Sequence, residues 1–140
     1  GVTEKTLRDH YQIRAVLEGY ACVLCVETGA DLSALQNCLK ASEEMLASGD
    51  SSKYSDMNQS FHYEIWNASG NEKLVTMLSE LWNGLSMGVQ TTEMEYAKKS
   101  FAEHKKIYEA IAAKDAETAR AQMEKHIRRS LEDMLTRYRK

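Results

Sequence analysis

Apolar side chains recur every three or four positions along most of the chain, which is the spacing of one face of an α-helix. This pattern predicts six helices. Their apolar residues fall within about 7–24, 32–46, 52–69, 71–90, 92–113 and 119–134. No segment alternates β-branched residues as a strand would, and the connections are short. The sequence therefore predicts an all-α fold, an antiparallel bundle of about six helices.

Residues that end or begin helices stand between these segments. Gly29 follows the first helix and Gly70 the third, and glycine readily takes the left-handed conformation found at helix C-termini. The side chains of Asp31 and Asp115 are predicted to cap the second and sixth helices. The chain contains no proline, so none of the predicted helices is expected to be broken by one.

The composition is that of one globular domain. Of the 140 residues, 43% are hydrophobic and 28% are charged, and this length is enough to bury one sizeable core. We therefore expect residues 1–140 to form a single domain. Neither a run of about 20 apolar residues nor a charged-then-apolar leader is found in the chain, so we expect a cytoplasmic protein without a membrane segment.

The three cysteines, Cys22, Cys25 and Cys38, indicate a reducing compartment, because an odd number cannot all be paired in disulfides. Cys22 and Cys25 have the CxxC spacing of some metal and redox sites. The surrounding residues follow a helical pattern, however, and no second pair of cysteines accompanies them. We interpret both as small apolar residues within a helix.

Three of the four histidines stand where apolar residues would be expected. His62, His104 and His126 each lie on or beside the inward stripe of a different predicted helix. Because a bundle brings the inward faces of its helices together, we expect the three imidazole rings to meet near one point. Asn58 lies four residues before His62, so the two side chains share a face about one helical turn apart.

Three imidazole nitrogens and an amide oxygen form a donor set that suits a first-row divalent metal. Zinc is the first expectation, and nickel, iron(II) and manganese(II) are the alternatives. Such a site would keep one or two coordination positions for water or for the carboxylate of an effector. The same pattern also allows three core histidines that are hydrogen-bonded to neighbouring groups, without any metal.

Arg14 lies on an otherwise apolar face of the first predicted helix. A guanidinium group at such a place needs an anionic partner. One candidate is Glu18, one helical turn later, as an ion pair. The other is the carboxylate or phosphate of an effector, which an arginine can bind through two parallel hydrogen bonds.

Three segments resemble one known family over about residues 7–135. The string NQSFHYEIWNASGN at 58–71 is similar to the central signature of the FadR C-terminal (FCD) domain, which is found in GntR-type transcription regulators. The string EHKKIYEAIAAKDAETARAQMEKHI at 103–127 is similar to the second signature of the family, two histidines on either side of a helix–Asp–helix junction. The opening IRAVLEGYA at 13–21 resembles the motif of the first helix.

This resemblance implies a helical bundle that forms a homodimer, binds a divalent metal and senses a small carboxylate effector near that metal. Transferred to this chain, the implied metal ligands are Asn58, His62, His104 and His126. Many relatives have aspartate in place of Asn58, so the resemblance implies weaker metal binding here and more dependence on an anionic effector. Many also carry an arginine where this chain reads LWNGLSMG, which leaves Arg14 as the expected effector-binding residue.

In such regulators a winged helix-turn-helix precedes the FCD domain. It is absent from this chain, which starts abruptly at Gly1, so we expect contact with operator DNA only through that missing part. The formal net charge of −3 agrees, because a domain that binds DNA phosphates carries an excess of lysine and arginine. The predicted function is ligand sensing and dimerisation in a bacterial regulator, without enzyme activity.

Two other functions fit a helical bundle with inward histidines: a mononuclear metalloenzyme and a metal-free interaction module. Ferritin-like di-iron sites need Glu-x-x-His pairs, and no histidine in this chain has an acid three residues before it. We also expect no acidic side chain on an inward stripe beside a ligand, and hence no general base for a metal-bound water. The sensing domain is therefore the preferred interpretation.

Overall fold

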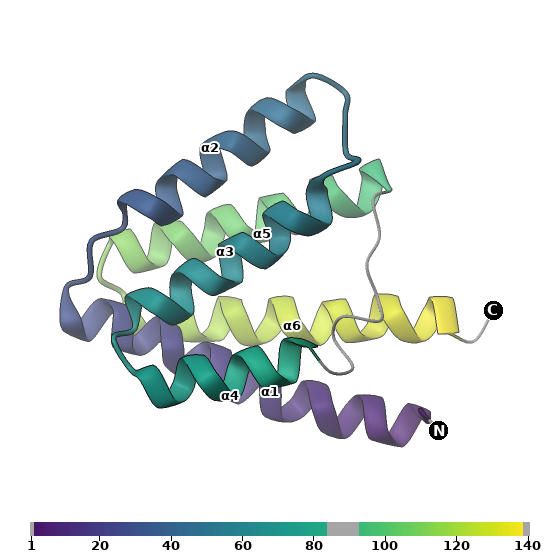
Figure 1. The fold of residues 1–140 in the computed structure, drawn as a ribbon, viewed down its shortest axis with the longest axis horizontal. Helices are drawn as coiled ribbons and strands as arrows, with labels where there is room; N and C mark the ends of the chain where they lie inside the picture. Colours follow the sequence, from purple (N-terminus) through teal and green to yellow (C-terminus); the bar gives the residue numbers. More distant parts are fainter. Residues whose placement is uncertain (1, 84–92, 139–140) are drawn as a thin grey trace.

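The computed structural model describes residues 2–83 and 93–138, and all regular structure in these residues is helical (Figure 1). The helices are α1 Glu4–Thr28, α2 Ser33–Ala47, α3 Tyr54–Ala68, α4 Glu72–Asn83, α5 Met94–Ala112 and α6 Ala116–Tyr138. The prediction of an all-α bundle of six helices is confirmed. The sequence extends the fourth helix to about residue 90 and starts the fifth at about 92, and both of these ends lie outside the described residues.

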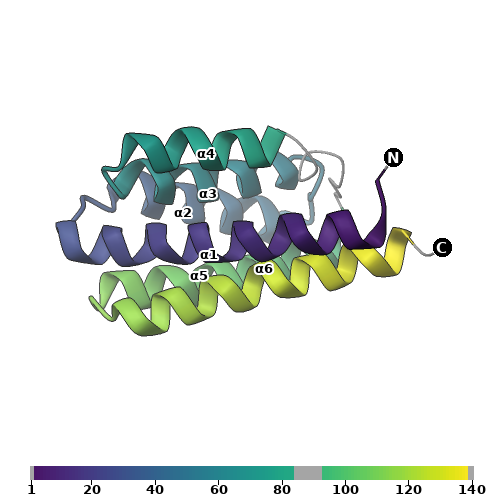
Figure 2. The ribbon, with the colours of Figure 1, turned by 90° about the horizontal axis from the view of Figure 1, so that it is seen from below.

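The two longest helices form the base of the bundle. α1 has 25 residues and α6 has 23, and they run antiparallel in the most extensive contact between any two described helices. α5 packs on α6, and α2 packs on both α3 and α5. Figure 2 shows α1 between α4 on one side and α6 on the other. The interior is therefore enclosed by helices that are distant in sequence.

Local hydrogen bonds explain where helices begin. The carboxylate of Asp115 accepts hydrogen bonds from the backbone N–H and the hydroxyl of Thr118, at 3.1 and 2.7 Å, which caps α6 as predicted. The sequence predicts the same role for Asp31, but α2 begins at Ser33 with Leu32 at the cap position. Asp31 instead accepts hydrogen bonds from the N–H and the hydroxyl of Ser33. These bonds close a turn just before the helix.

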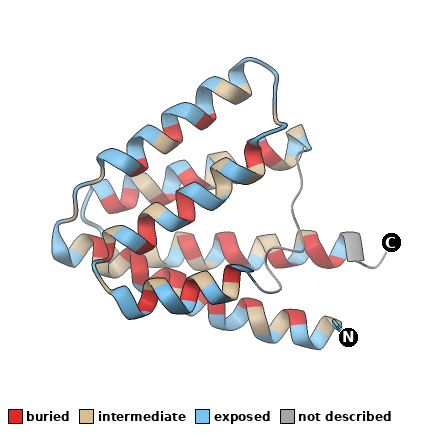
Figure 3. Cartoon of the chain, in the orientation of Figure 1, coloured by how far each residue is buried: buried red, intermediate tan, exposed pale blue. Residues whose placement is uncertain are grey.

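The buried faces of the helices point to one interior (Figure 3). Its largest fully buried apolar side chains are Tyr54, Phe61, Leu35, Ile65, Leu78, Ile107, Met123, Ile127 and Leu135. The buried polar and charged residues of the described segments are Arg14, Glu18, Ser42, His62, Ser69, Ser100, His104 and His126. Within these segments, none of the helices combines the length and the apolar content that a membrane crossing requires.

The CxxC pair belongs to this interior. Cys22 and Cys25 are buried on α1, and the Cys25 thiol donates to the carbonyl oxygen of Ile65 at 3.2 Å. Burial raises the pKa of Cys25 to about 12. Both thiols therefore pack as small apolar groups between α1 and its neighbours, as the sequence predicts.

Candidate metal centre

Three histidine side chains meet in the middle of the bundle. His62 comes from α3, His104 from α5 and His126 from α6, and none is more than 2% exposed. Their ring centroids lie 5.3 Å (62–104), 5.4 Å (62–126) and 4.8 Å (104–126) apart. One nitrogen of each ring lies within 4.8 Å of the others. Nitrogens around a tetrahedral zinc are about 3.3 Å apart, given Zn–N bonds of about 2.0 Å, so a small inward shift of the rings would suffice.

Glu18 of α1 holds His62 in place. Its Oε1 lies 2.5 Å from His62 Nδ1 and accepts a hydrogen bond from Trp66 Nε1 at 2.9 Å. Its Oε2 accepts from Arg14 Nε at 2.6 Å. An ionised carboxylate can only accept, so His62 donates from Nδ1. The lone pair on Nε2 is thereby left for a metal.

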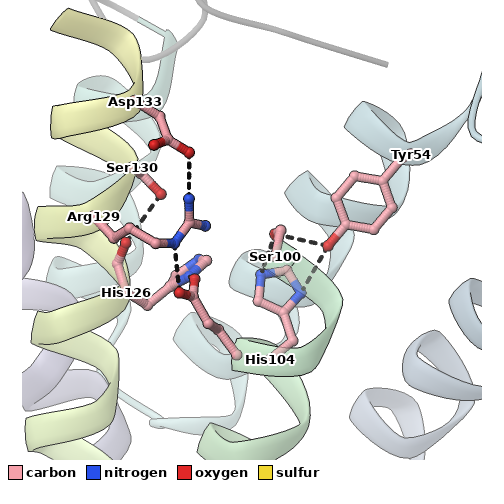
Figure 4. A network of polar contacts seen from close by, with 8 residues as sticks. Tyr54, Ser100, His104, His126, Arg129, Ser130 and Asp133 are labelled. Carbon is pink, nitrogen blue, oxygen red and sulfur yellow. Dashed lines mark hydrogen bonds and ion pairs between the residues drawn. The ribbon is translucent and has the colours of Figure 1, made fainter. Parts of the chain in front are cut away.

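Glu103 of α5 holds His126 in the same manner. Its Oε1 lies 2.6 Å from His126 Nδ1, and its Oε2 accepts from Arg129 Nε. Arg129 also donates to Asp133, one turn further along α6 (Figure 4). The prediction that no acid lies beside a ligand is thus wrong. Glu18 and Glu103 stand on other helices than their histidine partners, and the packing of those helices brings the carboxylates inward.

His104 is held mainly by packing. The hydroxyl oxygen of Tyr54 lies 3.4 Å from His104 Nδ1, and that of Ser100 lies 3.5 Å from Nε2 (Figure 4). Both distances are long for hydrogen bonds, and the Tyr54 hydroxyl makes a shorter bond of 2.8 Å to Ser100. The ring of Phe61 stacks on the imidazole, with the centroids 3.8 Å apart. No carboxylate therefore directs this third ring among the described residues.

Burial controls the charge of two of the three rings. It lowers the pKa of His104 well below the ordinary value, and positive charge on His126, His62, Arg129 and Arg14 would lower it further. Burial also lowers the pKa of His126 to about 4, although its hydrogen bond to the neighbouring carboxylate acts in the opposite direction. Both imidazoles are therefore neutral at pH 7, which is the form that binds a metal.

Two buried acceptor atoms on one face of α3 suit a cation. Asn58 Oδ1 and His62 Nε2 have no hydrogen-bond partner among the described residues. Leaving such an atom unpaired costs about 1–3 kcal/mol, and a bound metal would satisfy both. Three imidazoles with an amide oxygen, and carboxylates behind two of the rings, suit a divalent ion. The residues present thus fit the predicted metal.

Arg14 is buried in the wall of the same interior. It is 5% exposed, and its ion pair with Glu18 is the first of the two arrangements that the sequence allows. Its guanidinium carbon lies 4.6 Å from the centroid of the Trp82 ring and 5.4 Å from that of Tyr11. Both are cation–π contacts. Binding of an effector anion by Arg14 stays a prediction.

Sequence reasoning missed three residues next to the triad: Trp82, Glu103 and Arg129. A signal existed for Arg129, because a position three residues after His126 shares its helix face. No such signal existed for Glu103. Its partner His126 lies 23 positions away on another helix, and only the packing of α5 against α6 joins them.

A family model of the FCD domain matches residues 9–129. The chain belongs to the FCD domain family. The match confirms the resemblance to this family that the sequence shows, and a relative of the chain is named as a transcriptional regulator. The HTH-type transcriptional regulator LutR of Bacillus subtilis (strain 168) is 31% identical over 140 residues, which cover 91% of this chain and 61% of LutR. The chain thus spans less than two thirds of that relative.

Solved structures show the same bundle. E. coli McbR/YncC superposes with a TM-score of 0.82 at 24% identity, over 98% of this FCD domain and 68% of that chain. A metal-free FCD domain of TM0439 gives a TM-score of 0.78 at 20% identity, over 94% and 92% of the two chains. At these identities the likeness establishes the fold alone.

Proposed function

We propose that this FCD domain is the effector-sensing and dimerisation part of a bacterial transcription regulator. The family assignment and the regulator LutR among the relatives support this function. On this proposal the domain binds a divalent metal and a small organic acid, and transmits their binding to a DNA-binding domain outside the chain. Its own net charge of −3 suits a domain that does not bind DNA phosphates.

The observation that carries the proposal is the buried triad together with the unpaired Asn58 Oδ1. We assign Asn58, His62, His104 and His126 as ligands of a divalent metal, with zinc first and nickel, iron(II) or manganese(II) as alternatives. A bound cation of this kind would attract a carboxylate to its remaining coordination positions. The four ligands bring no negative charge, so an anionic effector would strengthen metal binding.

Arg14 is the proposed contact for the effector carboxylate. It is the buried arginine of α1, and its partner Glu18 is hydrogen-bonded to the proposed ligand His62. An anion bound at Arg14 would therefore act on the same carboxylate that orients His62. This contact connects effector binding with the position of α1.

We propose α1 as the surface that joins two copies of the domain. Between residues 12 and 26 the only charged side chains are Arg14 and Glu18, and both are buried. The large apolar side chains on the outer face of the helix are Ile13, Val16 and Tyr20. A helix that is apolar on all sides is normally buried. Antiparallel pairing of two α1 helices would also place Lys5 of one copy near Glu27 of the other.

A regulatory response then requires two arrangements of the dimer. An effector shifts their equilibrium only by its difference in affinity for the two. Because α1 carries Glu18 on its inner face and the proposed dimer surface on its outer face, movement of this helix would change the spacing of the attached DNA-binding domains.

Metal analysis of the purified chain tests the ligand assignment. We expect about one divalent ion per chain, and its loss in His62→Ala, His104→Ala and His126→Ala. Asn58→Asp adds a negative charge and should tighten binding, whereas Asn58→Ala should weaken it. Asn67→Asp, exposed on the same helix, is the matched control. If Asn58→Asp left the affinity unchanged, Asn58 would not be a ligand.

Calorimetric titration of small carboxylic acids into the metal-loaded chain tests the sensor function. At least one acid should bind with measurable heat and raise the melting temperature, and Arg14→Gln should weaken its binding. A panel that produced neither heat nor a thermal shift would contradict an effector-binding role.

A metal-free interaction module is the second candidate function. It is favoured by the hydrogen bonds that Glu18 and Glu103 already make to two of the three histidines. In that case the purified chain would contain no metal, and a chelator would leave its melting temperature unchanged.

A further inference from the structure

Four buried side-chain nitrogen or oxygen atoms lack a hydrogen-bond partner among the described residues: Asn58 Oδ1, His62 Nε2, Trp82 Nε1 and Arg129 Nη2. The first two are acceptors, and a cation would satisfy them. The other two are N–H donors, which a cation cannot satisfy. Buried donors are rarely left unpaired, so Trp82 and Arg129 need an acceptor that the described residues do not supply.

Both donors adjoin the triad, on different helices. Trp82 of α4 has its ring centroid 5.3 Å from that of His62, and the guanidinium of Arg14 lies over its ring. Arg129 of α6 is bound to Glu103, the same carboxylate that holds His126. Figure 4 shows Arg129 beside His126 and on the side of α6 that faces His104. Trp82 thus lies beside His62, and Arg129 lies beside His126.

The charges near the triad favour a doubly negative ligand. Arg14 is paired with Glu18, and Arg129 with Glu103, so each pair is neutral. Asp133, the other partner of Arg129, has a side chain that is 32% exposed, and solvent screens its charge. An imidazole that binds a metal through its lone pair is uncharged, and so is an amide, so these four ligands would leave both charges of a divalent ion uncompensated. A buried charge is stable only when it is balanced.

We propose that the effector is a small dicarboxylate, and that Arg129 Nη2 and Trp82 Nε1 are donors that recognise its oxygens. This inference rests on the proposed function, because it takes the triad to hold a divalent metal. One carboxylate would complete the metal site near Arg14, and the second would accept the hydrogen bond from Arg129. Arg129 Nη2 also distinguishes a dicarboxylate from a monocarboxylic acid, because a monocarboxylic acid would leave this donor unpaired.

The test compares acids of equal length with one or two carboxylates. Malonate, succinate and glutarate are titrated into the metal-loaded chain, each against its counterpart propionate, butyrate or pentanoate. We expect at least one dicarboxylate to bind about 10- to 100-fold more tightly than its counterpart, which corresponds to one charge-assisted hydrogen bond. Asn58→Asp adds a negative charge beside the metal and should reduce this preference.

Arg129→Lys identifies the donor. Lysine keeps the positive charge that Glu103 and Asp133 require but removes the Nη2 donor, so the dicarboxylate should lose its advantage while the monocarboxylate binds as before. Trp82→Phe removes the other donor and keeps the ring, and it should weaken the dicarboxylate. Arg128→Lys is the matched control, because Arg128 directly precedes Arg129 and its side chain is 65% exposed. It should change the affinity for neither class of acid. Metal content is measured in every variant.

The contrary outcomes are distinct. Equal affinity for the two classes of acid, or equal weakening of both in Arg129→Lys, would overturn the dicarboxylate and leave the sensor function standing. Loss of metal in Arg129→Lys would also overturn it, because Arg129 would then act on His126 through Glu103. If neither class of acid bound to the metal-loaded chain, both this inference and the proposed effector function would fail.

Discussion

Glu18 is the residue through which α1 contacts the histidine triad. Its side chain is fully buried and accepts hydrogen bonds from Arg14, His62 and Trp66. Burial raises the pKa of Glu18, but the charge that His62 carries when protonated, the charge of Arg14 and the hydrogen bonds from His62 and Trp66 outweigh it, so the pKa lies below the ordinary value. The carboxylate therefore stays ionised, and removal of its charge would leave Arg14 buried without a counter-ion.

We expect Glu18→Gln to lower both stability and metal affinity. Breaking a buried ion pair by removing one partner costs about 3–5 kcal/mol, which urea unfolding of the chelator-treated chain would measure. Loss of the carboxylate behind His62 should weaken metal binding by about 10- to 100-fold. Glu27→Gln, exposed on the same helix, should change neither quantity. An unaltered metal affinity would show that Glu18 has only a structural role.

The cysteines are expected to be unreactive at neutral and mildly alkaline pH. Burial raises the pKa of Cys25 to about 12, and burial together with the charge of Glu64 raises that of Cys38 to about 11. A thiol stays protonated below its pKa, and only the thiolate reacts. Alkylation of the native chain should therefore stay slow from pH 7 to about 9, whereas the chain in urea should react as its thiols ionise near pH 8.5. Rapid native labelling at pH 8 would indicate a reactive CxxC pair.

At the scale of single elements, α1 has the composition of a buried helix on both its inner and its outer face. Its inner face carries Arg14 and Glu18 next to the triad, and its outer face exposes Ile13, Val16 and Tyr20 at 56, 60 and 48%. Polar residues would normally cover the outer face of a surface helix. These exposed apolar side chains contrast with the polar cover expected on a surface helix. They therefore favour α1 as the surface that a partner covers.

A charge among these exposed apolar side chains of α1 should separate the proposed dimer. Ile13→Glu would place two like charges at the interface and desolvate both, so the chain should become monomeric at concentrations where the wild type is dimeric. Gln36→Glu adds the same charge to an exposed position of α2, away from this surface, and should leave the dimer intact. Sedimentation velocity measures both. A wild-type chain that was itself monomeric would remove α1 as the dimer surface.

For the whole molecule, a metal bound at the triad should contribute directly to folding stability. The proposed metal-binding residues come from three helices, and a metal that binds only the folded chain stabilises it by about 2.7 kcal/mol at 100 times its Kd. For a domain of this size that is a rise in Tm of roughly 8 °C. Differential scanning calorimetry with and without a chelator should show the difference, and His104→Ala should abolish it. Identical melting in wild type and variant would contradict a metal in the triad.

The six helices, the cap at Asp115 and the inward positions of His62, His104 and His126 could all be predicted from the sequence. These are local properties: a residue's place on a helix face depends only on its distance along the chain from its neighbours. The same reasoning predicts a cap at Asp31, and this prediction is wrong, because the start of a helix depends on only one or two hydrogen bonds.

The partners of the histidines followed from the packing alone. Glu18 lies 44 positions before His62, and Glu103 lies 23 positions before His126. Contacts over such separations depend on which helices are adjacent, on their relative register and on rotamers, and none of these produces a periodic pattern. Sequence periodicity thus shows which faces turn inward. It does not show which side chains touch once those faces meet, because that depends on the free energy of packing the whole bundle.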